Sequence, residues 1–261
     1  MNIVNLEFKQ RKKSFIIWLA SCIFLIILFM LLHQAMISGQ IERPIFFKII
    51  NITKILGFTS ISSDNIQFDT YFIYFYQYIF LIQCIFCTLL GADILRKEET
   101  SNTIQYLYSM PISRAKIYFS KFISALLLST MFIVVIWVVL FCLIALLQPS
   151  SIATLLLNRK ILLIVFYTYL TAVAYLTLGL FISLLFKIST SSVIIGGILF
   201  LITYIIGFSS ELEYLSFYKY IDPGHFLYHF NELKAILLIS AIIIFFIAGM
   251  ILYKKRDFKI N

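Results

Sequence analysis

Two histidines, His225 and His229, have a residue type and a spacing that could do chemistry. They lie four positions apart, so a helix would place both imidazoles on one face, where they could hold zinc with Asp222 or Glu232 as a third ligand. The metalloprotease pattern H-E-x-x-H needs a glutamate after the first histidine, and Phe226 stands there. No general base is therefore positioned, and we interpret the pair as interfacial hydrogen-bonding groups rather than a metal site.

Two further pairs have spacings that occur in catalytic or metal sites. Cys84 and Cys87 form a C-x-x-C pair, but the sequence offers no second pair of ligands, so they are interpreted as small packing residues. Glu98 and Glu99 are adjacent, as in some membrane proteases. The histidine that lies inside an apolar run, His33, is near that run's outer end, so it cannot complete such a site. We expect neither catalysis nor a bound metal.

The elements that carry these residues are long apolar runs. The chain of 261 residues is 62% hydrophobic and 13% charged, which is outside the range of soluble domains. A membrane-spanning helix needs about 20 mostly apolar residues, and alternating barrel patterns are absent. The sequence predicts an all-α integral membrane protein with a single transmembrane domain over 1–261. Its six predicted spans are about 14–37, 71–92, 117–147, 161–186, 191–208 and 235–253.

The distribution of basic residues predicts the orientation of the spans. With the N-terminus inside, the outer segments hold Arg43, Lys48, Lys54, Arg159, Lys160, Lys219 and Lys234, and the other 14 of the 21 Lys and Arg lie inside. This excess is typical of cytoplasmic loops, so both termini are expected in the cytoplasm. The net charge of +9 is spread over short loops beside the spans. Anionic lipid explains it better than nucleic acid, which we do not expect as a partner.

Two segments outside the spans have distinct compositions. Residues 1–13 mix apolar and charged side chains, which favours a short interfacial helix on the inner leaflet; the alternative is a basic, disordered tail. The last outer segment, about 209–234, is rich in Tyr and Phe and contains Pro223 and Gly224. Two short helices dipping into the outer leaflet account for that composition better than a free loop.

The inner loop between the second and third spans predicts a short amphipathic helix. Glu98 and Glu99 suit the first turn of a helix, and Ile104, Leu107 and Tyr108 share one face of the following two turns. Pro111 ends this helix, and Ser113 can cap the next one. Such a helix, held between two membrane helices, is a docking element for a partner with a hydrophobic groove. The alternative is that it lies on the membrane surface.

The same loop resembles the characteristic motif of the type-2 ABC transporter permeases. The matching string is K-E-E-x-x-x-T-I-x-x-L-Y-S-x-P-I-S-R, followed by K-I and a later Lys, over Lys97 to Lys121. The resemblance implies that the loop is the coupling helix that sits on an ATPase subunit. It assigns that contact to Glu98, Glu99, Thr103, Ile104, Leu107, Tyr108, Pro111 and Arg114. Many members have Gly before the Thr; here it is Asn102, which tolerates similar backbone geometry.

The resemblance also implies partners for this chain. The sequence contains no G-x-x-x-x-G-K-[ST] phosphate loop, so ATP and Mg²⁺ are expected on two separate ATPase subunits, with no cofactor bound here. Two permeases, as a homodimer or a heterodimer, are expected per transporter. The family further has outer re-entrant helices between the last two spans. Tyr220, Asp222, Pro223 and His225 resemble that feature and are candidates for an outer gate.

Polar residues within the spans are candidates for a substrate path. Ionisable groups are almost absent from the span centres, which argues against a proton-coupled antiporter or a channel. The candidate lining residues are Tyr74, Gln77, Tyr78, Thr168, Thr171 and Tyr175. Hydroxyls and rings of this kind would suit an amphipathic or hydrophobic cargo. The alternative is that they form hydrogen bonds between helices.

The sequence as a whole predicts the membrane subunit of an ATP-driven ABC exporter in the cell membrane, of a bacterium by the resemblance. Peptides, antibiotics and lipid-like molecules are the cargo classes that fit. The alternative function is a non-transporting membrane scaffold or sensor that has the permease layout.

Overall fold

A computed structural model describes residues 3–38, 68–95, 113–147, 149, 159–185, 189–207, 216–220 and 232–255. Within these ranges every regular element is a helix, as expected for an all-α membrane protein. The helices are α1 (Ile3–Ile37), α3 (Phe68–Ile94), α6 (Arg114–Leu147), α8 (Arg159–Leu185), α9 (Ser189–Ile206), α10 (Phe217–Tyr220) and α12 (Glu232–Lys255).

Five of the described helices are long and apolar enough to cross a membrane: α1, α3, α6, α8 and α12. The fifth predicted span, 191–208, falls on α9, whose 18 residues extend about 27 Å at 1.5 Å per residue. This length is slightly less than the roughly 30 Å of a typical hydrocarbon core. The helix α1 continues through residue 13 without a break, so the predicted interfacial segment is the first part of the same helix.

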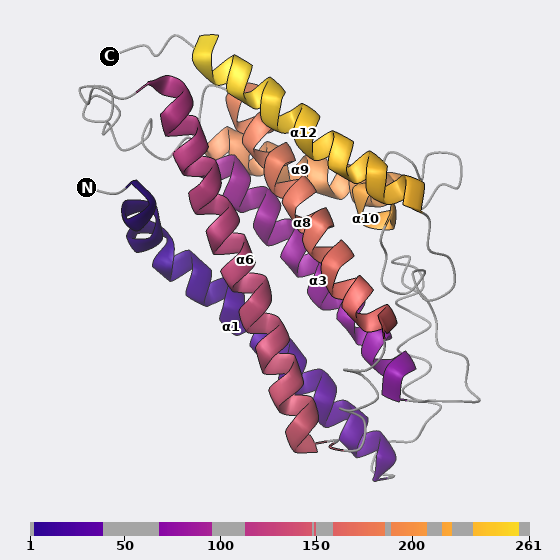
Figure 1. Cartoon of the computed structure of the whole chain (residues 1–261). Helices are drawn as coiled ribbons and strands as arrows, with labels where there is room; N and C mark the ends of the chain where they lie inside the picture. Colours follow the sequence, from indigo (N-terminus) through magenta and orange to yellow (C-terminus); the bar gives the residue numbers. More distant parts are fainter. Residues whose placement is uncertain are drawn as a thin grey trace.

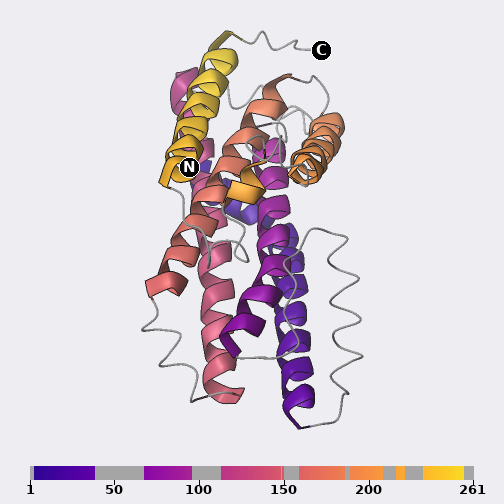
Figure 2. The same ribbon diagram turned by 90° about the vertical axis from the view of Figure 1, so that its right-hand side faces the viewer.

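The helices form a bundle with α3 and α8 at its centre (Figures 1 and 2). The most extensive contact is between α3 and α8. The helix α12 packs on α8, α9 packs on α3, and α1 packs mainly on α6. Apolar side chains remain exposed along α1, α6 and α12, among them Phe24, Val134 and Ile244. These outward faces suit contact with lipid chains, because a soluble helix would cover them.

Two glycines allow the central pair to approach closely. A Cβ at Gly91 of α3 would overlap the carbonyl oxygen of Leu176, and a Cβ at Gly179 of α8 would overlap the carbonyl oxygen of Thr88. The contact is reciprocal, so each glycine faces the backbone of the other helix. Small residues support this kind of packing in membranes, where close backbone approach replaces the hydrophobic effect as the source of helix association.

One end of the bundle collects the start of α1, the end of α3, the start of α6 and the end of α12 (Figure 1). Lys121 of α6 contacts Glu7 of α1, and Arg114 of α6 donates a hydrogen bond to the carbonyl of Lys254 in α12. The helix α12 begins with Glu232 and ends with Lys254 and Lys255, charges that complement the helix dipole at each terminus. We call this end the loop end, because the inner loop leaves α3 and enters α6 here.

Candidate functional site

A buried ion network lies at the loop end. Lys121 Nζ is 3.4 Å from Glu7 Oε1 and donates a 2.8 Å hydrogen bond to the carbonyl of Ile94. Arg11 Nε lies 3.1 Å from Glu7 Oε2, and Arg11 Nη1 pairs with Asp93 Oδ2. The charges thus alternate in sign along the chain of contacts from Lys121 through Glu7 and Arg11 to Asp93. These contacts join α6, α1 and α3.

Burial makes this network energetically important. Lys121 is 0% exposed, Glu7 1% and Arg11 6%, while Asp93 is partly exposed. Isolated charges would be very costly at such positions, so each charge depends on its partners. The Glu7–Arg11 spacing of four residues places both side chains on one face of α1, toward α3 and α6. The network therefore fixes the start of α1 against the two helices that flank the inner loop.

The predicted coupling residues fall largely on that loop. Glu98, Glu99, Thr103, Ile104, Leu107, Tyr108 and Pro111 lie outside the described residues. Arg114 is described: it is the first residue of α6, and its Nη1 donates a 3.2 Å hydrogen bond to Lys254 O. Ser113 Oγ accepts a 3.4 Å hydrogen bond from Lys116 N, which confirms the predicted cap. Both ends of the loop are thus held by side chains.

Four of the candidate path residues are buried between helices. Gln77, Thr168, Thr171 and Tyr175 are all 0% exposed. Thr168 and Thr171 donate to backbone carbonyls one turn earlier in α8. The Tyr175 hydroxyl is 3.4 Å from Thr203 Oγ1. In this state these groups pack between helices rather than lining an open channel.

The two other candidate path residues lie in α3. Tyr78 is half-buried and stacks on Phe29 of α1, with ring centroids 5.4 Å apart. Tyr74 also belongs to α3, but its side chain lies outside the described part of the chain.

A polar cluster at the centre of the bundle includes a residue that sequence reasoning missed. The Tyr76 hydroxyl lies 3.2 Å from Thr168 Oγ1 and 3.4 Å from Gln83 Oε1. Trp137 packs on the Tyr76 ring, with centroids 4.8 Å apart. Gln83 Nε2 is buried without a hydrogen-bond partner. The seven-residue spacing of Tyr76 and Gln83, which puts both on one face of α3, was the signal available in the sequence.

The described part of the candidate outer gate is α10, which packs on α8, α9 and α12. Tyr220 is its last residue, with its side chain outside the described part, and Asp222, Pro223 and His225 also lie outside the described residues. The residue that anchors α10 is Tyr218, which the sequence analysis did not select. Its backbone N–H donates to the Tyr175 hydroxyl at 3.2 Å, and its own hydroxyl donates to the carbonyl of Gln77 at 3.2 Å.

The described residues do not gather into a metal site. No three His, Cys, Asp or Glu side chains among them lie where they could hold an ion together. Cys84 and Cys87 are buried with free thiols between packed helices. His229 lies outside the described residues, as does His225.

Comparison with known proteins identifies the family. Neither the curated proteins nor the solved structures contain a match to this chain. A sequence model of the ABC-2 family transporter proteins matches residues 1–258, nearly the whole chain. That match confirms the family resemblance seen in the inner loop. The chain belongs to the ABC-2 family of transporter proteins and is a type-2 ABC transporter permease, the membrane component of an ABC transporter rather than its ATPase.

Proposed function

We propose that this permease forms the translocation path of an ATP-driven exporter for an amphipathic or hydrophobic cargo, such as a peptide, an antibiotic or a lipid-like molecule. Energy comes from two separate ATPase subunits that bind ATP and Mg²⁺. Two permeases, identical or related, complete the transporter in the cell membrane, and by the resemblance this is a bacterial plasma membrane.

One observation carries the proposal: the inner loop, with its motif from Lys97 to Lys121, joins two helices that are held at their loop ends by buried charges. Lys121 links the last turn of α3, through Ile94 O, to Glu7 of α1. Arg114 links the start of α6 to the end of α12. A displacement of the loop would therefore act on four membrane helices at once.

The arrangement of the helix ends supports cytoplasmic termini and six spans. The start of α1 and the end of α12 lie at the loop end together with the basic residues Lys9, Lys12, Lys13 and Lys255 (Figure 1). With α9 counted as the fifth crossing, an even number of spans returns the chain to the side on which it began. The positive charge at this end assigns that side to the cytoplasm.

The geometry supports a mechanism in which closure of the ATPases pushes on residues 98–110. Because the ion network joins α1, α3 and α6, the push rotates these helices together rather than bending the loop. The central contacts of Tyr76, Thr168 and Tyr175 then separate, and their hydroxyl groups become available to the cargo. Tyr218, which is bonded to both Tyr175 and Gln77, would have to release α8 and α3 for such a path to open.

Placing a charge on the apolar face of the inner-loop helix should uncouple the permease from its ATPase. In the Leu107→Asp variant, a carboxylate replaces an apolar contact at the centre of the docking face. We expect association with the ATPase to weaken by about tenfold or more, since central contacts of this kind dominate interface energies. Co-purification and ATP hydrolysis in proteoliposomes measure the loss.

Gln105→Asp is the matched control, because position 105 lies about 200° around a helix from position 107. It adds the same charge to the opposite face and should leave association intact. Normal coupling in the Leu107→Asp variant would remove the docking role and would favour a non-transporting scaffold.

A cysteine in the inner loop should crosslink to the ATPase subunit. The described native thiols Cys22, Cys84 and Cys87 are buried, so replacing the exposed Cys142 by Ser leaves little background reactivity. In that background, Ser109→Cys should form a disulfide with an ATPase cysteine under mild oxidation. Ser38→Cys, at the opposite end of α1, should not. Crosslinking at position 38 instead of 109 would place the ATPase at the wrong end of the bundle.

A further inference from the structure

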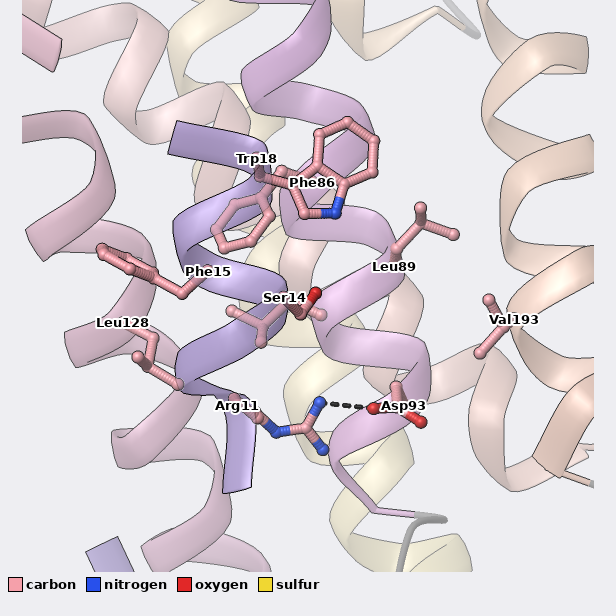
Figure 3. Close-up of a pocket in the computed structure, with 10 residues that line it drawn as sticks. Arg11, Ser14, Phe15, Trp18, Phe86, Leu89, Asp93, Leu128 and Val193 are labelled. Atoms are coloured by element: carbon pink, nitrogen blue, oxygen red, sulfur yellow. Dashed lines mark hydrogen bonds and ion pairs between the residues drawn. The ribbon is translucent and has the colours of Figure 1, made fainter. Parts of the chain in front are cut away.

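A cavity of about 260 Å³ opens beside the ion network, between α1 and α3 (Figure 3). Each of these helices contributes one face to the lining, at positions i, i+3, i+4 and i+7. The lining residues are Arg11, Ser14, Phe15 and Trp18 of α1, and Phe86, Leu89, Leu90 and Asp93 of α3. Leu128 of α6 and Val193 of α9 complete the lining.

The lining changes from polar to apolar along the helices. Arg11, Ser14 and Asp93 lie at the loop end, whereas Trp18 and Phe86 lie toward the interior of the membrane (Figure 3). Arg11 and Trp18 are separated by seven residues, which is about 10 Å along a helix. The cavity thus has a charged end and an apolar end. The charged end lies where a leaflet has its headgroups, and the apolar end lies where it has its acyl chains.

The polar end of the lining holds one cation, Arg11, and one anion, Asp93, and the guanidinium has one nitrogen left for a further acceptor. Arg11 is nine-tenths buried, and its Nη2 has no hydrogen-bond partner in the structure, although Nη1 is paired with Asp93. Lys12 and Lys13, which follow directly on α1, are exposed outside the lining and add positive charge to this end of the helix. A guanidinium prefers phosphate oxygens, which it can bind through two nitrogens. Basic pockets between membrane helices at the cytoplasmic side are typical sites for anionic lipid headgroups.

We propose that this cavity binds an anionic amphiphile with a phosphate diester headgroup, of the phosphatidylglycerol type. The phosphate contacts the Arg11 guanidinium and the Ser14 hydroxyl, and one chain passes Trp18, Phe86 and Leu89. The cavity is slightly smaller than the pockets of about 300–1,000 Å³ that enclose drug-sized ligands. It therefore takes the headgroup and the first part of one chain, while the remainder stays in the bilayer.

The protein has two tryptophans, Trp18 and Trp137, so one substitution makes the cavity observable. A phenyl ring keeps the packing on Tyr76, so Trp137→Phe should fold normally. In this variant all tryptophan fluorescence comes from Trp18. The purified full-length variant is reconstituted in phosphatidylcholine vesicles, and brominated phosphatidylglycerol or brominated phosphatidylcholine is added in increasing proportion.

We expect brominated phosphatidylglycerol to quench Trp18 at about fivefold lower mole fraction than brominated phosphatidylcholine. One additional contact between a basic side chain and an anionic headgroup would give a difference in affinity of this size. Arg11→Gln should abolish this preference. Because Arg11 also serves the ion network, Ser14→Leu provides a second test: it fills the polar end from an exposed position and should abolish the preference without touching the network. Ser21→Leu, an exposed serine two turns further along α1, is the matched control and should keep it.

Three results would overturn the proposal. Equal quenching by both lipids would mean that bulk lipid chains enter an apolar crevice without headgroup recognition. A preference retained in both the Arg11→Gln and Ser14→Leu variants would place the lipid elsewhere. Displacement of the lipid by millimolar inorganic phosphate would indicate a site for a soluble anion. The test uses the permease alone, so its failure leaves the proposed coupling to an ATPase untouched, and failure of that coupling leaves lipid binding intact.

Discussion

Gly179→Val is expected to prevent the permease from assembling its central helix pair. The new Cβ overlaps the carbonyl oxygen of Thr88, a backbone atom that cannot move aside by changing rotamer. The helices α3 and α8 must separate, and the reciprocal contact at Gly91 is lost as well. We expect a loss of at least about 3 kcal/mol in the free energy of unfolding, at the upper end of what overpacking costs. Denaturant unfolding of the purified protein in bicelles measures it.

Gly197→Ala is the control for this substitution. A Cβ at Gly197 would lie 3.9 Å from Leu89 Cδ2, which is ordinary van der Waals contact. Its effect on the unfolding free energy should stay within about 0.5 kcal/mol. If Gly179→Val unfolds at the same denaturant concentration as Gly197→Ala, then α3 and α8 do not cross as the structure has them.

Lys121→Met should destabilise the loop end by about 3–5 kcal/mol, because it leaves Glu7 buried with one of its two cations removed. The hydrogen bond to the Ile94 carbonyl is also lost. A lower unfolding temperature and weaker stimulation of the partner ATPase are the expected results. Lys116→Met removes the same charge from an exposed position of α6 and should change stability little.

A double-mutant cycle tests whether the Lys121 effect comes from the pair. Glu7→Gln removes the negative charge, so the Lys121→Met/Glu7→Gln double variant should be more stable than Lys121→Met alone. A coupling energy near zero would show that Lys121 and Glu7 act independently and that the network does not join α1 to α6.

The helices themselves were predictable, because the energetics of burying a backbone in lipid leave few solutions. Runs of apolar residues set the positions of α1, α6 and α12, and a proline-terminated loop with a capping serine set the start of α6. The family could be recognised from the inner loop, since its motif lies in local sequence. These features depend on neighbours along the chain, which a sequence shows directly.

The buried network was not predictable, because its members lie far apart in sequence. Lys121 was counted among the basic residues of the cytoplasmic loops, yet it is completely buried. The i, i+4 spacing of Glu7 and Arg11 was visible, but an interfacial helix on the membrane surface would show the same spacing. Only the packing of α1 against α3 and α6 turns surface charges into buried ones.

The small residues illustrate a related limit. Gly179 and the Gly196–Gly197 pair lie within apolar runs, where small residues indicate close helix contact within the chain or between two permeases. In the structure Gly179 faces α3 of the same chain, and Gly196 would bring a Cβ within 3.3 Å of the Ala92 Cβ. A small residue predicts that a backbone comes close, but it carries no information on which helix supplies that backbone.

The central position of α3 has a consequence for the biogenesis of the protein. Among the five candidate spans α3 has the lowest mean hydropathy, and it carries Gln77, Gln83 and Thr88. During synthesis it leaves the ribosome before α8, whose Thr168 later bonds Tyr76. Until α8 is made, the Tyr76 hydroxyl lacks this partner, and lipid solvates polar side chains poorly. We therefore expect α3 to remain beside the insertion machinery until the second half of the chain arrives to enclose it.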